Sequence, residues 1–268
     1  LRSDRLAGRR INVAFVSSNP TGPLHVGHAR NAALGDGIAA LLASQGAEVT
    51  REYYFNDAGR QMDILGASVH ARYRQLRDPD FPFPEEGYQG EYIAELAREL
   101  AAERGDALHE VPFEACLPEF RAFAGDRISA GIRTDLERFR VAFDVWFNES
   151  TLYRDGRMDK TLEELRAIGA AYEKDGAMWL RATDYGDTED RVLVKSSGLP
   201  TYLLPDLAYH RDKHERGFDQ AQDLARICGR ELGLPAIAAL ERAERTAAMH
   251  ALGRTERAAN VGGAFRVR

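Results

Sequence analysis

Cysteine is scarce in this 268-residue sequence, and long apolar runs are missing from it. The two cysteines, Cys116 and Cys228, are too few for the disulfide framework of a small secreted protein. No run of 18 apolar residues occurs, which excludes an ordinary membrane-spanning helix, and the first residues contain no apolar signal-peptide core. We therefore expect a cytoplasmic protein that does not contact a membrane.

Positive charge is also in deficit. The sequence holds 36 Lys and Arg against 42 Asp and Glu, a net charge of −6 at pH 7. This balance disfavours a general nucleic-acid-binding surface, although it is compatible with a local basic patch. Hydrophobic residues make up 44% of the sequence, enough for the core of one large domain or two smaller ones.

The most informative passage predicts a strand, a turn and a helix near the start of the sequence. Residues 11–16 are mostly apolar and rich in β-branched side chains, as in a buried strand of a parallel sheet. The Asn-Pro-Thr-Gly-Pro run at 19–23 then takes the chain out of the sheet at its carboxyl edge, where open α/β sheets bind ligands. Apolar residues at helical spacing predict a helix over 24–44.

His25 and His28 lie in the first turn of this predicted helix, three residues apart. This spacing places both imidazoles on one side of a helix end whose free N–H groups and dipole attract anions such as phosphates. Gly27 between them would let a ligand approach the backbone closely. The pair could instead be two surface histidines or half of a metal site. Because no third ligand follows at a familiar spacing, we expect no resident metal.

Three ordered blocks carry a family resemblance. Residues 17–36 contain the His-Val-Gly-His run, residues 51–61 read Arg-Glu-Tyr-Tyr-Phe-Asn-Asp-Ala-Gly-Arg-Gln, and residues 194–213 contain Thr-Tyr and Asp-Leu-Ala-Tyr-His. The first block resembles the first signature of class I aminoacyl-tRNA synthetases, and the three together resemble arginyl-tRNA synthetase. Their order along the chain makes coincidence a poor explanation.

The resemblance implies an α/β fold in which a Rossmann-like parallel sheet is interrupted by an α+β insertion. We expect the first half of the catalytic domain at 1–76, the inserted connective domain at 77–189, the start of the second half at 190–219 and an atypical helical tail at 220–268. The tail includes an expected helix at 241–252, although its apolar face is thin.

Within the expected insertion, the spacing of apolar residues predicts several elements. Helices are predicted near 90–104, 114–140 and 157–172, followed by a hairpin or meander over 177–195. The apolar and aromatic run at 143–147 is also assigned to the insertion.

The resemblance also implies a reaction. The carboxylate of L-arginine would attack the α-phosphate of ATP, which enters with Mg²⁺, to give arginyl-adenylate and pyrophosphate. The arginyl group would then pass to the 3′ end of tRNA(Arg). His25 and His28 would be the catalytic residues, donating hydrogen bonds to the ATP phosphates beside Gly27. We expect the protein to act as a monomer.

The family's arginine site maps onto five residues, Ser17, Ser18, Asn19, Tyr202 and Asp206. The first three suit the ammonium and carboxylate of the substrate. Tyr202 and Asp206 would hold its guanidinium, because a carboxylate accepts two parallel N–H bonds from that group. Asp206 could alternatively be the N-cap of the helix that follows it.

Two residues of the third block have two possible roles each. Tyr209 and His210 could reach the adenosine of ATP, or they could pack in the core. Both interpretations remain open from the sequence.

The resemblance ends after Asp219. Residues 220–268 contain neither the strand and Gly-Ala-Asp-His block expected next nor the lysine-bearing second signature. The resemblance also leads us to expect a tRNA-elbow domain at the amino end and an anticodon-binding domain at the carboxyl end, and neither is found in these 268 residues. A partial or frame-shifted gene product, which we favour, a shortened paralogue, or a piece of a longer chain would each explain this. We expect these 268 residues alone to show weak or no arginine-dependent ATP–pyrophosphate exchange.

Two other functions remain open. The chain could be a non-catalytic module that binds arginine or a nucleotide. It could also activate arginine and pass it to a small molecule or a carrier protein instead of tRNA.

Overall fold

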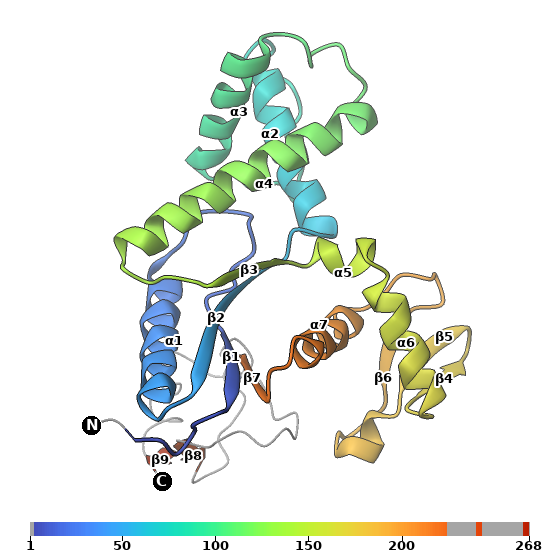
Figure 1. Ribbon diagram of the computed structural model, residues 1–268. Coiled ribbons are helices and arrows are strands. Elements are labelled where there is room, and N and C mark those ends of the chain that lie inside the picture. The colour runs from blue at the N-terminus through green and yellow to red at the C-terminus, as the bar shows by residue number, and fades with distance from the viewer. Residues whose placement is uncertain (1–2, 224–239, 243–264, 268) are drawn as a thin grey trace. The chain divides into compact units, whose positions relative to one another are not determined.

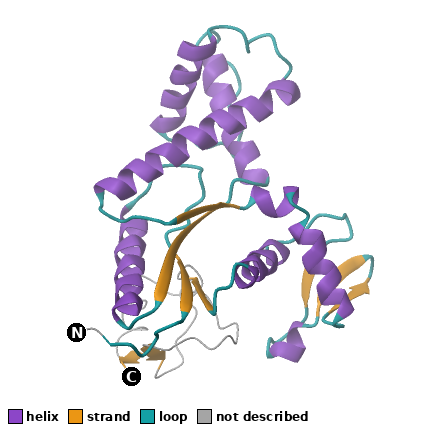
Figure 2. Ribbon diagram, viewed as in Figure 1, coloured by secondary structure: helices purple, strands orange, loops and turns teal. Residues whose placement is uncertain are grey.

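The computed structural model describes residues 3–223, 240–242 and 265–267 (Figure 1). The chain divides into two compact units, Leu1–Arg230 and Glu231–Arg268. The first unit contains a parallel sheet, a group of three helices and a small antiparallel sheet (Figure 2). Among the described residues, no helix is both long and apolar enough to span a bilayer.

Four strands form the parallel sheet, in the order β3-β2-β1-β7. They are β1 (Arg10–Ala14), β2 (Glu48–Phe55), β3 (Val145–Asn148) and β7 (Gln220–Asp223). Ile11 of β1 lies opposite Val49 of β2 and Gln220 of β7, and Tyr53 of β2 lies opposite Trp146 of β3. Ile11 and Tyr53 are completely buried, as in the core of a covered parallel sheet.

Helix α1 (Val26–Ser44) connects β1 to β2. It ends before Gly46, whose φ of 91° lies in the left-handed region that stops a helix. Gly35 lies in the middle of α1 against the ring of Phe15, and a Cβ atom built on Gly35 would lie 2.2 Å from Cγ of Phe15. The absence of a side chain at Gly35 therefore lets α1 approach the end of β1.

Three helices lie between β2 and β3 in the sequence and pack together at the top of Figure 1. They are α2 (Arg60–Gln75), α3 (Glu91–Arg104) and α4 (Phe113–Arg138). Their buried side chains recur at helical spacing and join the core of the parallel sheet; they include Leu65, Val69, Ile93, Leu100, Phe120 and Ile132.

A second core lies between a small antiparallel sheet and the helices around it. The sheet contains β4 (Ala171–Lys174), β5 (Ala177–Leu180) and β6 (Arg191–Val194) in that order. The neighbouring helices are α5 (Ser150–Arg154), α6 (Arg157–Ala167), the 3-10 helix η1 (Ala182–Tyr185) and α7 (Leu203–Glu215). Leu193, Leu204 and Tyr209 belong to this core.

Several predicted elements are confirmed. The parallel sheet is present, and α3 and α4 match the helices predicted at 90–104 and 114–140. The meander predicted over 177–195 consists of β5 and β6, with β4 as a third strand. The helix predicted at 157–172 is wrong beyond Ala167, because Gly169 adopts a φ of 74° and β4 begins at Ala171.

The sequence assigns the run 143–147 to the insertion, and this assignment is wrong. β3 pairs with β2 in the parallel sheet, so residues 145–148 belong to the same sheet as β1. Conversely, β6 pairs with β5 in the antiparallel sheet, although its residues fall in the segment 190–219 expected in the second half of the catalytic domain. The domain boundaries themselves remain a prediction.

The segment after Asp219 also differs from the expectation. Residues 220–223 form β7, so a strand does follow Asp219. In the second unit, β8 (Leu240–Arg242) and β9 (Phe265–Val267) pair in antiparallel fashion. The helix expected at 241–252 is therefore wrong at 241 and 242, and its remaining positions lie outside the described residues.

Gly35→Ala should destabilise the protein, because the added methyl group would meet the ring of Phe15. We expect a loss of about 1–3 kcal/mol, as in other overpacked cores. Gly37→Ala on the same helix is the matched control. No atom lies within 4 Å of the Cβ position of Gly37. The better helix propensity of alanine should therefore stabilise that variant by up to about 1 kcal/mol. Chemical denaturation measures both changes, and equal effects would contradict the close packing of Gly35.

Candidate active site

The chain leaves β1 through two residues with a strained backbone. φ is 63° at Val16 and 44° at Ser17, in the left-handed region that side chains other than glycine rarely adopt. Such a conformation costs roughly 1–3 kcal/mol and persists only where surrounding contacts impose it. The Val16 N–H donates to Oδ1 of Asn31 at 2.9 Å, and the Tyr54 N–H donates to Oγ of Ser17 at 3.2 Å. The turn is thus held by α1 on one side and β2 on the other.

Ser18 and Asn19 follow this turn and have different environments. Ser18 is buried, and its N–H and Oγ lie 3.1 and 2.6 Å from the hydroxyl of Tyr53. Burial raises the pKa of Tyr53 to about 12, so its hydroxyl is neutral. Asn19 is exposed and donates from Nδ2 to Oε1 of Gln61 at 2.6 Å. Ser18 therefore braces the turn, while Asn19 is presented at the surface.

The two histidines lie at the N-terminus of α1. His25 is the N-cap: its Nδ1 accepts the Gly27 N–H at 3.1 Å, and Nδ1 of His28 accepts the His25 N–H at 3.2 Å. The rings stack, with centroids 3.8 Å apart and planes inclined by 19°. A Cβ atom on Gly27 would lie 2.9 Å from Cε1 of His25, so this glycine makes room for the capping ring. The predicted placement of both imidazoles on one side of the helix end is confirmed.

These capping bonds determine the tautomer of each neutral ring. One nitrogen of a neutral imidazole accepts and the other donates, so a ring whose Nδ1 accepts carries its proton on Nε2. Both rings therefore offer an Nε2–H donor. The pKa of His28 is lowered, first by burial and then by the neighbouring His25. His28 can thus donate a hydrogen bond to an anion as a neutral imidazole.

The other predicted arginine-binding residues lie at the start of α7. Tyr202 is the N-cap and is 81% exposed. Asp206 is half-buried in the first turn, and its N–H donates to the carbonyl of Tyr202 at 3.4 Å. The alternative interpretation of Asp206 as the N-cap is therefore wrong. An acidic residue in the first turn interacts favourably with the positive end of the helix dipole.

Tyr209 packs in the core of the first unit. It is 2% exposed, and its ring lies against Tyr54 and Phe147, with centroids 4.6 and 4.8 Å away. Its hydroxyl donates to Glu52 of β2. The packing interpretation of Tyr209 is thus confirmed, and the contact with ATP stays a prediction that this burial disfavours.

His210 is half-buried next to Tyr209. Burial, and then the charge of Lys213, lower the pKa of His210 to about 4. His210 is therefore a neutral side chain near pH 7. Whether it contacts ATP remains a prediction.

Glu149 is a buried carboxylate that the sequence analysis does not find. It follows β3 at the same sheet edge as the strained turn, and its two oxygens accept hydrogen bonds from the hydroxyls of Tyr54 at 2.7 Å and Tyr153 at 3.3 Å. Burial raises the pKa of Glu149, and the nearby charge of Asp57 adds to this, whereas the two hydroxyls lower it. A buried carboxylate with neutral donors gains strongly from a cation.

The signal for Glu149 was present in the sequence. An acidic residue directly after a short apolar strand lies at the ligand-binding edge of a parallel sheet. Assigning 143–147 to the insertion removed that strand from the sheet, and Glu149 with it. Asp57, which follows β2, is a further acidic residue at this sheet edge; it accepts the Ser150 N–H at 2.9 Å and the Ser150 hydroxyl at 2.7 Å.

One hollow borders the candidate site, with Asn148 and Ser150, the chain neighbours of Glu149, in its lining. It measures about 380 Å³ and opens beside β3 and α5, between side chains such as Phe147, Ser150 and Arg154, and none of the predicted site residues lines it. In the part of the chain that the structure describes, no group of three or more His, Cys, Asp or Glu side chains could hold a metal ion. The strained turn, the histidine pair and the carboxylates remain the best-supported site.

His28 should titrate below the ordinary histidine pKa of 6.5, because burial and His25 both disfavour its charged form. His25→Asn keeps a good N-cap and removes the neighbouring imidazole. It should raise the pKa of His28 without restoring 6.5, because the burial remains. NMR titration of the imidazoles measures this. Buried His70, a matched control in α2, should titrate identically in both proteins. An unchanged His28 would show that the stacked pair is not electrostatically coupled.

Comparison with known proteins identifies the family. The profile described as "tRNA synthetases class I (R), catalytic domain" matches residues 3–223. Arginine–tRNA ligase of Syntrophotalea carbinolica is 50% identical over 217 residues, covering 81% of this chain and 39% of that protein. The ligase of Bacillus subtilis is 50% identical over 213 residues, with 80% and 38% coverage. A crystal structure described as an arginyl-tRNA synthetase from Campylobacter jejuni shares 34% identity and a TM-score of 0.76, covering 83% of this chain and 48% of its own.

The matched region and its extent correct one expectation and confirm another. The chain spans 39% of the length of the first of these relatives. The match runs to residue 223, so it includes β7 and continues past Asp219, where the sequence analysis ended it. The resemblance carried by the three sequence blocks is confirmed. This chain belongs to the class I tRNA synthetase (R) catalytic-domain family.

Proposed function

We propose that this chain forms the arginine- and ATP-binding part of an arginine–tRNA ligase. In this reaction the carboxylate of L-arginine attacks the α-phosphate of ATP, and the arginyl group then passes to tRNA(Arg). The observation that carries the proposal is the stacked His25–His28 pair, whose capping bonds leave two Nε2–H donors at the N-terminus of α1. Donors held in advance can stabilise the charge that develops on a phosphate without reorganising.

The ATP site would centre on this pair. His25 and His28 would donate to the phosphates, and Gly27 keeps the backbone between them free of side-chain bulk. Mg²⁺ is commonly held by substrate phosphates and water with one or two carboxylates, so it would enter with ATP and need no protein cage. His210 is neutral near pH 7 and would meet the adenosine without adding charge.

The arginine site would combine the strained turn with carboxylates from distant segments. Ser17 and Asn19 would bind the ammonium and carboxylate of the substrate, and Ser18 would hold their turn in place. Asp206, flanked by Tyr202, would accept the guanidinium N–H groups.

Glu149 adds a second acidic group to this site. Contacts link it to α7, because Tyr54 donates to Glu149 and its ring packs on Tyr209, three residues from Asp206. A guanidinium would supply the cation that the neutral hydroxyl partners of Glu149 lack.

The remaining expectations follow from the family. tRNA(Arg) would be the acceptor of the arginyl group, which the longer relatives' names support. We propose a cytoplasmic monomer.

Asp206→Asn and Glu149→Gln should each weaken arginine binding by about tenfold or more, because each removes a charged hydrogen-bond acceptor. Isothermal titration calorimetry with L-arginine measures this, and L-lysine, which cannot make paired N–H bonds, should bind more weakly to the unmodified chain. Glu163→Gln, an exposed carboxylate on α6, is the matched control and should change nothing. If the unmodified chain bound neither amino acid, or both equally, the proposed arginine site would be wrong.

A further inference from the structure

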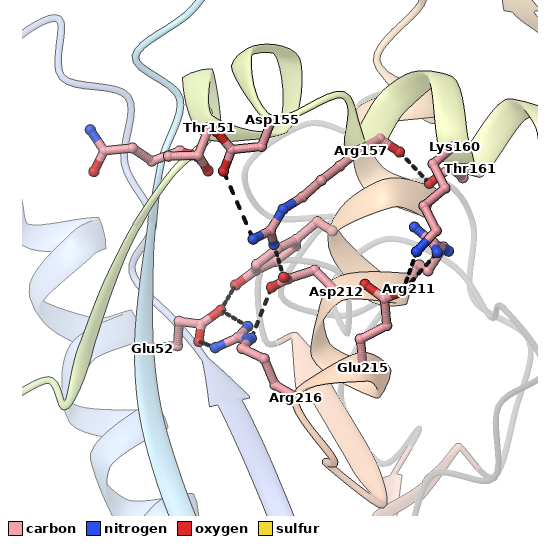
Figure 3. Close-up of polar contacts among 12 residues, drawn as sticks. Glu52, Thr151, Asp155, Arg157, Lys160, Thr161, Arg211, Asp212, Glu215 and Arg216 are labelled. Atoms are coloured by element: carbon pink, nitrogen blue, oxygen red, sulfur yellow. Dashed lines mark hydrogen bonds and ion pairs between the residues drawn. The ribbon is translucent and has the colours of Figure 1, made fainter.

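A completely buried carboxylate, Glu52, lies on β2 in the interior of the parallel sheet. Arg216, the C-cap of α7, donates to it through two nitrogens, Nη1 at 2.6 Å and Nη2 at 3.0 Å. The hydroxyl of Tyr209 on α7 also donates to Glu52, and Nδ2 of Asn12 on β1 does so at 2.9 Å. Figure 3 shows Glu52 and Arg216 facing each other between β2 and α7.

A second buried carboxylate, Asp212, extends this arrangement along α7. Nε of Arg216 lies 2.8 Å from Oδ2 of Asp212, so the same guanidinium pairs with both acids. Arg157 at the start of α6 also pairs with Asp212 (Figure 3). Lys213, completely buried, lies over the ring of Tyr209 with Nζ 4.0 Å from its centroid. We call these charged groups together with Tyr209 and Asn12 the α7 anchor.

The anchor keeps Glu52 charged. Burial by itself would raise the pKa of Glu52, but the hydrogen bonds from Arg216 and Tyr209 and the charges of Lys213 and Arg216 outweigh it and lower the pKa. Buried ion pairs of this kind contribute little net stability compared with apolar residues of the same volume. They do impose direction, because a bidentate guanidinium fits a carboxylate in few orientations.

The anchor holds the C-terminal half of α7, and the proposed arginine site uses its N-terminal half. Just beyond Arg216, Nη1 of Arg10 on β1 donates to the carbonyls of Arg216 and Gly217 at 3.0 and 3.1 Å, which ties that end to the sheet. Asp206 lies about one helical turn before Tyr209. A helix transmits rotation and translation along its length, so the anchor determines where Asp206 lies.

We propose that Glu52 and Arg216 are positioning residues. By fixing how α7 is rotated and where it lies against β2, they set the affinity of the chain for arginine. This inference rests on the proposed function. The anchor residues come from β1, β2, α6 and α7, whereas the histidine pair lies at the start of α1 and is fixed by its own capping bonds. Loss of the anchor should therefore weaken the binding of arginine much more than the binding of the ATP phosphates.

The test measures both ligands on the same 268-residue chain. Glu52→Gln keeps the shape of the side chain and removes its charge, and should weaken arginine binding by about tenfold or more, as small misplacements of binding groups do. The dissociation constant for ATP should change much less, since the phosphate-binding histidines lie on α1 and His210 is the one proposed ATP contact on α7. Glu164→Gln, which breaks an ion pair between Arg211 of α7 and α6 on the exposed side of the helix, is the matched control and should change neither constant.

A double-mutant cycle separates positioning from general destabilisation. If Glu52 and Arg216 act as one unit, the double variant Glu52→Gln, Arg216→Gln should lose no more arginine affinity than either single variant. Hydrogen exchange gives a readout that needs no ligand: amides of 203–209 should exchange faster in Glu52→Gln, and those of α3 should not. If Glu52→Gln does not fold, Arg216→Lys is the alternative variant, because it keeps the positive charge and removes the paired N–H bonds. It should also lose arginine affinity in preference to ATP affinity, but to a smaller degree.

The outcomes distinguish a failure of the proposed arginine site from a failure of the α7 anchor. If the unmodified chain does not bind arginine, the proposed function fails, and the exchange rates of 203–209 alone test the anchor. If the unmodified chain binds arginine and Glu52→Gln binds it equally well, the positioning role is overturned. Parallel loss of arginine and ATP affinity would also overturn it, because a collapse of the whole sheet would then explain the result.

Discussion

The need to pair a charge inside a parallel sheet organises this structure. Glu52 on β2 is completely buried, and a carboxylate in that position is costly unless cations and donors surround it. Arg216 and Tyr209 supply that pairing from α7, and Asn12 supplies it from β1. The helix that carries Asp206 is thereby attached to β2, the strand that ends beside the strained turn.

The two halves of the site depend on different ranges of sequence. The half formed by Ser17, Asn19 and the histidines is local, and the spacing of turn formers, glycine and histidine predicted where the two imidazoles lie. The reason is physical: His25 and His28 cap a helix through bonds between neighbours, so their geometry depends on few distant residues. The same holds for α3 and α4, whose apolar spacing decided their bounds almost to the residue.

The other half could not be derived in that way. The sequence signal for Glu149, an acidic residue after a short apolar run, does not say which sheet that run joins, and the pairing of β3 with β2 decides it. The partners of Glu52 on α7 are 157 and 164 residues away in the sequence, and no local pattern predicts such a pair. The helix predicted to reach residue 172 ends earlier, because Gly169 adopts a left-handed φ that stops it.

Two buried carboxylates, Glu52 on β2 and Glu149 just after β3, have opposite electrostatic environments. Glu52 has its charge met by an arginine and a lysine from within the protein, and its pKa is lowered. Glu149 is held by two neutral hydroxyls, and its burial, together with the charge of Asp57, raises its pKa despite those hydrogen bonds. The carboxylate of Glu52 is thus paired with cations of the protein, whereas the hydrogen-bond partners of Glu149 are neutral. A cationic ligand gains only at the second, and this contrast favours a guanidinium near Glu149 while assigning Glu52 to holding α7.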